Sequence, residues 1–87
     1  MQTRQVEVTN SLGLHARLAA RIVHLASRFS CQVSLVFKGR TANARNLIPV
    51  MLLAAAVGST IRIEANGPDE AEALDALSSL IGDQSDR

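Results

Sequence analysis

The sequence is poor in aromatic residues and in cysteine. It has no tryptophan and no tyrosine, and Phe29 and Phe37 are its only aromatic side chains. Apolar residues make up 47% of the 87 residues, so one small domain over residues 1–87 with an aliphatic core is expected. The lone Cys31 excludes an internal disulfide, and without a second thiol it is expected to be a small buried or loop residue.

Charge and long hydrophobic runs are also scarce. Nine basic residues and eight acidic residues leave a formal charge of +1, which gives no reason to expect binding to nucleic acid or lipid. The longest apolar-rich run, 47–57, contains Pro49 and is too short to span a membrane. The polar N-terminus passes directly into strand-like alternation, which does not resemble a signal peptide. We therefore expect a cytoplasmic protein.

Hydrophobic periodicity predicts the element order βαββαβα. Four strands and three helices in a small chain favour an α+β sandwich with the helices on one face of a sheet. The outward-facing residues of the first and last predicted strands are polar, which predicts that the other face of the sheet is solvated. These residues are Gln5, Glu7, Arg62 and Glu64. The predicted strands are 5–9, 32–37, 40–44 and 60–65, and the predicted helices are 16–29, 47–56 and 71–81. Gly67-Pro68-Asp69-Glu70 is predicted to start the last helix, with Pro68 at the first helical position.

His15 stands where a glycine turn meets the start of the predicted helix 16–29. A neutral imidazole is a nucleophile at physiological pH, and a helix start offers free N–H groups that bind anions. The backbone N–H groups of Ala16 and Arg17 can point at phosphoryl oxygens, and the Arg17 guanidinium adds a planar donor fork. Gly13 allows backbone angles that expose the ring. A histidine at a helix start is more often a simple cap, but its neighbours here predict a phosphoryl acceptor.

The second histidine does not join the first. His24 lies nine residues further along, about half a turn away around the helix axis, so the two rings cannot share a metal. No metal site and no cofactor are therefore predicted. Arg17, Arg21, His24 and Arg28 form a stripe that is usually a solvated face. Because this stripe continues from His15, we expect Arg21 to help steer acidic partners.

The segment 47–53 is too apolar to be buried on one narrow helix. Some of its side chains must be exposed, and an exposed apolar patch often marks an interface. The alternative is a wide buried stripe with one or two stray apolar side chains. Ile48 and Met51 are spaced to share one face, and Asn46 is a good N-cap candidate.

At this point the chain resembles the HPr family, the histidine phosphocarriers of the phosphoenolpyruvate-dependent sugar phosphotransferase system. The resemblance covers almost the whole length and rests on collinear motifs: Gly13-Leu14-His15-Ala16-Arg17, Asn43-Ala44-Arg45-Asn46-Leu47-Ile48 with Gly58-Ser59-Thr60-Ile61, and Asn66-Gly67-Pro68-Asp69-Glu70-Ala71. It implies an open-faced β-sandwich, an antiparallel four-stranded sheet with three helices on one face.

The resemblance also implies a relay. Enzyme I, charged from phosphoenolpyruvate, phosphorylates His15 at Nδ1, and His15 passes the group to a IIA protein or domain. Arg17 then lies beside the phosphohistidine, and Leu47, Ile48 and Met51 lie on the partner-contact patch. Such a protein is expected to be a monomeric carrier rather than an enzyme in the usual sense.

Two positions depart from the family pattern. Leu18 stands where many HPr proteins have proline, and Asn46 stands where many have a regulatory serine, with Arg45 in place of a lysine. Asparagine can cap a helix but has no hydroxyl to phosphorylate. The residues leave three readings open: the main sugar carrier, a regulatory paralogue such as a nitrogen-branch carrier in which the state of His15 controls partner binding, or a scaffold that has lost transfer.

Overall fold

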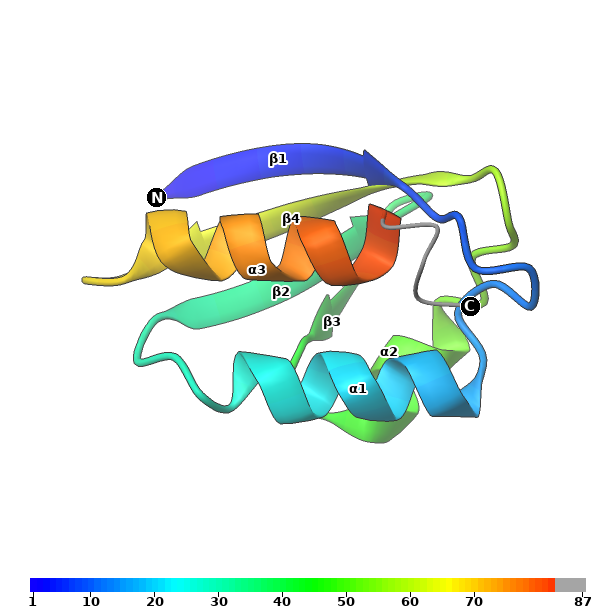
Figure 1. Ribbon diagram of the computed structural model, residues 1–87, viewed down its shortest axis with the longest axis horizontal. Coiled ribbons are helices and arrows are strands. Elements are labelled where there is room, and N and C mark those ends of the chain that lie inside the picture. Colours follow the sequence, from blue (N-terminus) through cyan, green and yellow to red (C-terminus); the bar gives the residue numbers. More distant parts are fainter. Residues whose placement is uncertain (83–87) are drawn as a thin grey trace.

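The computed structural model describes residues 1–82 and confirms the predicted order of elements (Figure 1). The strands are β1 (Gln2–Glu7), β2 (Gln32–Phe37), β3 (Arg40–Asn43) and β4 (Thr60–Asn66). The helices are α1 (Ala16–Ala26), α2 (Leu47–Leu52) and α3 (Glu70–Gly82). None of the helices in this part of the chain is long and apolar enough to cross a bilayer.

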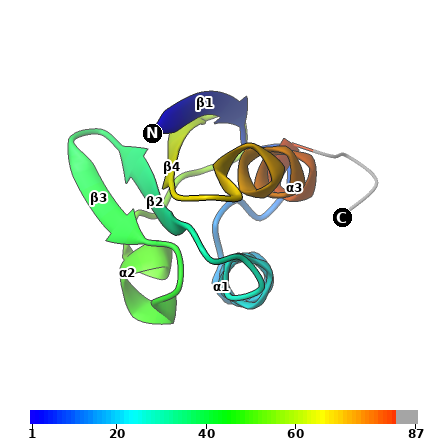
Figure 2. The ribbon, with the colours of Figure 1, turned by 90° about the vertical axis from the view of Figure 1, so that its left-hand side faces the viewer.

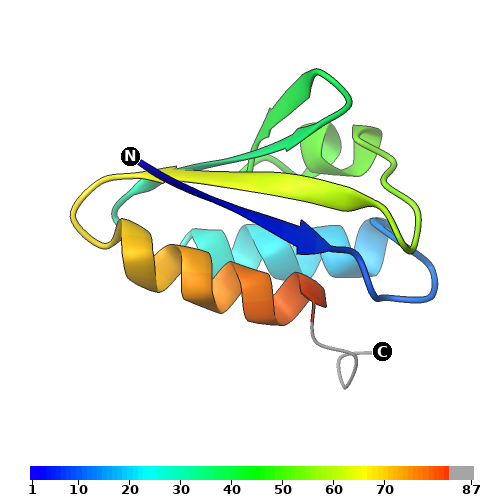
Figure 3. The same ribbon diagram turned by 90° about the horizontal axis from the view of Figure 1, so that it is seen from above.

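The four strands form one antiparallel sheet in the order β1-β4-β2-β3. Central β4 pairs Ile61 with Val6 of β1 and Ile63 with Leu35 of β2, and β3 lies at the edge beside β2. Figures 2 and 3 show α1 and α3 running side by side along the sheet, with α2 near its β3 end. The predicted α+β open-faced sandwich is confirmed.

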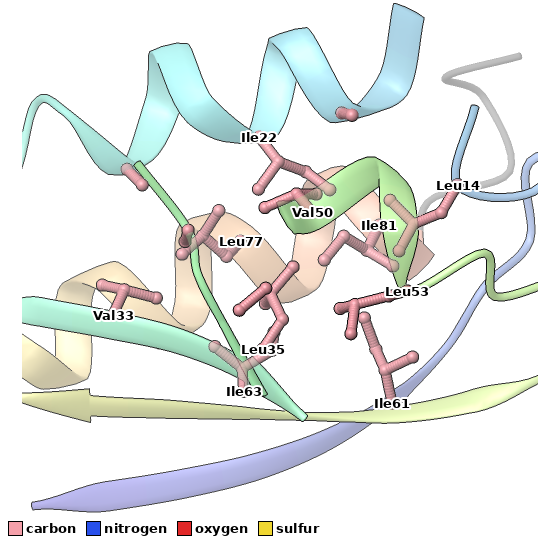
Figure 4. Packing of buried hydrophobic residues seen from close by; sticks show 14 of the residues in the cluster. Leu14, Ile22, Val33, Leu35, Val50, Leu53, Ile61, Ile63, Leu77 and Ile81 are labelled. Carbon is pink, nitrogen blue, oxygen red and sulfur yellow. The ribbon is translucent and has the colours of Figure 1, made fainter. Parts of the chain in front are cut away.

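The core between the sheet and the helices is aliphatic, as the composition predicts. Along β4, Ile61 and Ile63 are buried while Arg62 between them is exposed, because successive strand residues point to opposite faces. Figure 4 shows these isoleucines meeting side chains from α2, from α3 and from the loop before α1. Each fully buried leucine or isoleucine contributes about 1.5–3 kcal/mol. Phe29 and Phe37 only pack against the margin of this cluster.

The opposite face of the sheet is polar and open to solvent. Gln5, Glu7 and Arg62 are exposed, and Glu64 is half-buried. The Arg62 Nε–H donates to Glu64 Oε2 at 3.0 Å, an exposed pair whose contribution to stability is small. The predicted solvated face is thus confirmed.

Three element boundaries differ from the predicted ones by three residues or more. β1 begins at Gln2 because the polar residues 2–4 continue the ladder opposite residues 63–65 of β4, although they show no apolar alternation. α1 ends at Ala26 rather than 29, where the N–H of Arg28 turns to the Leu25 carbonyl. α2 ends at Leu52 rather than 56, because Ala54 takes a left-handed conformation with φ of +54°.

The start of α3 also corrects a prediction. The helix begins at Glu70, so Pro68 lies before it and not at its first position. The Asp69 carboxylate accepts the N–H groups of Ser30 and Cys31 at 2.8 and 2.9 Å, which ties the helix start to the chain before β2. Those bonds, the Ser30 bond foremost, hold the pKa of Asp69 below its usual value. Cys31 is buried, as expected, and burial raises the pKa of its thiol.

The Asp69 contact predicts an acid-sensitive part of the stability. A depressed carboxyl pKa stabilises the fold above the pKa of the unfolded chain, and that contribution is lost as the pH falls through the folded value. We expect the difference in Tm between the wild type and Asp69→Asn to shrink as the pH falls from about 5 to about 2. Circular dichroism melts measure this. Glu72→Gln, which removes an exposed carboxylate in the first turn of α3, is the matched control. A pH-independent difference in Tm for Asp69→Asn would contradict the stabilising role of the Asp69 carboxylate.

A buried hydroxyl on α3 predicts a stabilising substitution. Within residues 1–82, Ser78 Oγ is buried and has no hydrogen-bond partner. Such a group costs about 1–3 kcal/mol, and alanine also favours helix over serine. Ser78→Ala should raise the free energy of unfolding by about 1 kcal/mol in urea denaturation. The exposed neighbour Ser79→Ala measures helix propensity alone and should gain less; equal gains would contradict a cost from the buried hydroxyl.

Candidate functional site

His15 is the N-cap residue of α1, where the sequence places it. Its backbone is extended, with φ of −90° and ψ of −179°, and its carbonyl accepts the N–H of Ala19. The backbone N–H of Arg17 donates to His15 Nδ1 at 3.4 Å. This long hydrogen bond requires a lone pair on Nδ1, so the ring proton is assigned to Nε2. The half-buried ring therefore turns its Nδ1 toward the positive end of the helix.

A glycine in the left-handed region brings the chain to that helix start. Gly13 has φ of +68°, and its N–H donates to the Asn10 carbonyl at 2.8 Å. A Cβ at Gly13 would lie 2.6 Å from the Ala55 carbonyl oxygen, which is closer than real side chains approach. The next residue, Leu14, donates its N–H to the same oxygen at 2.9 Å. The predicted role of Gly13 thus has two causes, its backbone angles and the close passage of residue 55.

The core holds this loop in place. The side chain of Leu14 is 4% exposed and points into the aliphatic cluster, near Leu53 and Ile81 in Figure 4. Leu18, one turn further on, is also buried. Because the residues on both sides of His15 are fixed in the core, the imidazole stays at the surface in one place. Leucine at position 18 therefore serves packing, and the helix start is formed without proline.

A small hollow lies beside the ring. It has a volume of about 90 Å³ and is lined by His15, Arg17, Leu18 and Arg21 of the α1 start and by Asn10, Ser11 and Leu12 of the preceding loop. The first turn of a helix leaves the N–H groups of Ala16 and Arg17 without acceptors inside the helix. A cavity of this size beside these donors suits a small anion rather than an organic cofactor. The structure thus brings His15, Arg17 and Arg21 to one hollow, while Ala16 follows His15 in the helix start but does not line the hollow.

The apolar residues expected at the interface occupy the neighbouring helix. Leu47 and Ile48 of α2 are 39% and 61% exposed, while Val50 is buried and Met51 packs partly against the core. α2 contacts α1 but contributes nothing to the lining of the His15 hollow. Asn46 takes the N-cap position of α2, as expected, but its side chain makes no capping bond. The expected interface residues therefore lie beside the site, not in it.

Some features of the site could not be read from the sequence. Leu12 is 72% exposed on the rim of the hollow, and its N–H donates to the Asn10 side chain at 3.0 Å. Its only sequence signal is a leucine placed in a polar loop. Arg45, in contrast, has a structural role, since its guanidinium donates to the carbonyls of Phe29 and Cys31. His24 is exposed on α1, and no three metal-ligating side chains come together in the described part of the chain.

Known proteins match this chain over nearly its whole length. A family model described as PTS HPr component, phosphorylation site, matches residues 2–83. Phosphocarrier protein HPr of Cupriavidus necator is 45% identical over 84 residues, which cover 97% of this chain and 94% of the relative. Phosphocarrier protein HPr of Xylella fastidiosa (strain Temecula1) is 46% identical over 81 residues, or 93% and 91% of the two chains.

Solved structures agree with these relatives. HPr-C-His of Thermoanaerobacter tengcongensis superposes with a TM-score of 0.89 at 38% identity, covering 93% of this chain and 91% of that one. Phosphocarrier protein HPr of Bacillus anthracis gives the same TM-score and identity over 92% and 95% of the chains. Sequence identity well above what a shared fold alone requires, sustained from β1 to the end of α3, assigns the chain to the HPr family, the phosphocarrier proteins of the phosphotransferase system.

Proposed function

We propose that this protein carries a phosphoryl group on Nδ1 of His15, taking it from Enzyme I charged by phosphoenolpyruvate and passing it to a IIA protein or domain. One observation carries the proposal: the Arg17 backbone N–H lies on Nδ1 at the start of α1. That contact supports Nδ1 as the nitrogen that carries the lone pair, because this atom accepts the hydrogen bond, and the anion-binding N–H groups of the helix start lie next to it.

The accepting step follows from this geometry. The Arg17 N–H leaves the Nδ1 lone pair, which attacks the phosphorus of the charged donor, and the N–P bond forms as the bond between phosphorus and the donor breaks. The backbone N–H groups of Ala16 and Arg17 then donate to phosphoryl oxygens, and the Arg17 guanidinium adds charge-assisted bonds. At the IIA acceptor the same N–P bond breaks, so the imidazole is regenerated and no cofactor is needed.

The proposed partner surface joins a basic and an apolar strip. Arg17 and Arg21 belong to the exposed side of α1, and Ile48 stands out from α2, which packs beside α1 (Figure 1). Leu47 and Met51 lie on the same helix, Leu47 exposed and Met51 packed partly against the core. Apolar side chains next to cations suit a partner with an acidic rim around a hydrophobic centre. We propose that the protein meets such partners as a monomer in the cytoplasm.

The regulatory paralogue is the second candidate. Asn46 bears on it, because an amide at the start of α2 has no hydroxyl and cannot receive a phosphoryl group as serine does. Control through that position is therefore absent in either case. The candidates differ in the fate of the group on His15: a transport carrier passes it on, whereas a regulatory carrier retains it while its state alters partner binding.

The first test follows phosphorylation by intact mass. With phosphoenolpyruvate and Enzyme I, the wild type should gain one acid-labile phosphoryl group, and His15→Ala should gain none because Nδ1 is removed. His24→Ala, which removes the second imidazole of the chain, is the matched control and should be modified like the wild type. Phosphorylation of His15→Ala would contradict the proposal. Loss of the group on adding a IIA domain supports transport, and its retention supports the regulatory candidate.

The partner surface predicts a second result. Ile48→Ser removes an exposed apolar side chain that would be buried in the complex, worth about 1.5–3 kcal/mol. The KM of Enzyme I for this protein should rise about tenfold with little change in kcat. Val57→Ser is the matched control, since Val57 is also a large exposed apolar residue but lies in the loop after α2, outside the proposed patch. Equal effects of the two substitutions on KM would argue against a patch centred on Ile48.

A further inference from the structure

Positive charge is concentrated in one stretch of the chain. Between Glu7 and Glu64 there are seven lysines and arginines and no aspartate or glutamate. This stretch builds α1, β2, β3 and α2, whereas the carboxylates of the described residues lie in β1, at the end of β4 and around α3. The basic region therefore reaches beyond α1 and His15, to the β2–β3 hairpin.

A groove runs between that hairpin and α2. Two adjoining hollows, of about 300 and 270 Å³, share Arg40 and Leu53. We call them together the hairpin groove, which is lined chiefly by Phe37, Lys38, Arg40, Thr41, Pro49 and Leu52. It shares no lining residue with the His15 hollow. Figure 2 shows β3 and α2 at the end of the molecule away from α3.

The exposed apolar side chains of α2 divide between two sides of the helix. At 100° per residue, Leu47 and Met51 lie about 40° apart on one side, and Pro49 and Leu52 lie about 60° apart on another, where they line a hollow with Arg40 and Thr41. Leu52 is 65% exposed. The patch proposed for Enzyme I and IIA consists of Leu47, Ile48 and Met51. The second side leaves Leu52 open to water beside Pro49.

Two cations stand at fixed places along the groove. The Arg40 guanidinium donates to the Leu52 carbonyl at 3.4 Å, and the Lys38 ammonium lies 5.3 Å from the centre of the Phe37 ring. No carboxylate lines the groove in the part of the chain that the structure describes. A bound segment that contains carboxylates would therefore pair with Lys38 and Arg40 beside an apolar surface, and no acidic side chain of the groove would repel it.

The edge strand adds backbone groups. The Ala44 N–H donates to the Val33 carbonyl at 2.9 Å, so Ala42 and Leu35 form the next hydrogen-bonded pair of the antiparallel ladder. Thr41, opposite Val36, therefore directs its N–H and C=O away from β2, toward the open edge of the sheet. An extended chain lying in the groove can pair with these groups.

We propose that the hairpin groove binds an extended acidic segment of a partner protein that carries an aliphatic side chain. The aliphatic group lies against Pro49 and Leu52, and flanking carboxylates pair with Lys38 and Arg40. A nucleic acid fits these features less well, because phosphates gain nothing from an exposed leucine and Lys38 covers the ring of Phe37. The proposal goes beyond phosphoryl transfer, since no groove residue takes part in it.

The test is an NMR titration of the full chain labelled with ¹⁵N. The probe is a blocked synthetic peptide in which aspartates and glutamates flank two leucines, and the comparison peptide has serines in place of the leucines. The leucine peptide should shift the amides of Lys38, Arg40, Thr41 and Leu52 along a saturable curve, and the serine peptide should bind about fivefold more weakly. Absence of saturable shifts, shifts centred on α1, or equal affinity for the two peptides would overturn the proposal.

Variants sharpen the assignment. Lys38→Gln and Leu52→Ser should each weaken binding of the leucine peptide about threefold or more. Arg28→Gln, which removes one exposed cation of the same basic stretch outside the groove, is the matched control and should bind like the wild type. Equal weakening by Arg28→Gln would reduce the result to general charge attraction and overturn the groove.

Two further measurements separate the alternatives. A single-stranded oligonucleotide that shifts the groove amides more tightly than the peptide, with no loss in Leu52→Ser, would replace the protein segment by nucleic acid. Phosphorylation of Lys38→Gln by Enzyme I should stay at the wild-type rate. A failed His15 test would leave the peptide result unaffected, so the two proposals fail separately.

Discussion

The close passage of the loop before α1 over the backbone at residue 55 is the constraint on which the site depends. Only a residue without a Cβ fits at Gly13, and only then can Leu14 bond to the Ala55 carbonyl and enter the core. With Leu14 buried, the next residue, His15, lies at the N-cap position of α1. There its Nδ1 accepts the Arg17 N–H. The position of His15 at the helix start thus depends on a backbone contact between Leu14 and Ala55, segments about forty residues apart.

The helix α2 is too short to bury most of its apolar side chains. This helix has six residues, and its buried side is little more than Val50, with Leu53 just beyond its end. It therefore cannot hide its other apolar side chains, which face outward on either side of Ile48. The short helix α2 is anchored because Val50, with Leu53 after it, packs into the aliphatic core. Small branched side chains from all layers interlock there, and the core does without a large aromatic anchor.

Much of the fold is predictable from local pattern. The alternation in β4, the four-residue spacing in α1 and the Gly13–Arg17 motif each gave the correct element. Predictions were wrong where tertiary contacts override local preference. β1 extends through polar Gln2 because β4 supplies its ladder partners, and α2 stops early because Ala54 turns left-handed. Pro68 lies outside α3 because Asp69 is engaged with residues 30 and 31.

The sequence by itself determined the element order, the aliphatic character of the core and the position of His15 at a helix start. These follow from spacing and residue type, which act over a few residues. Only the tertiary structure decided which nitrogen of His15 faces the helix, which side chains of α2 remain exposed, and that Lys38 and Arg40 share a groove with Leu52. The first is a local contact between residues 15 and 17, which depends on the side-chain rotamer of His15. The other two join segments distant in the chain, and they exist only when packing brings the segments together.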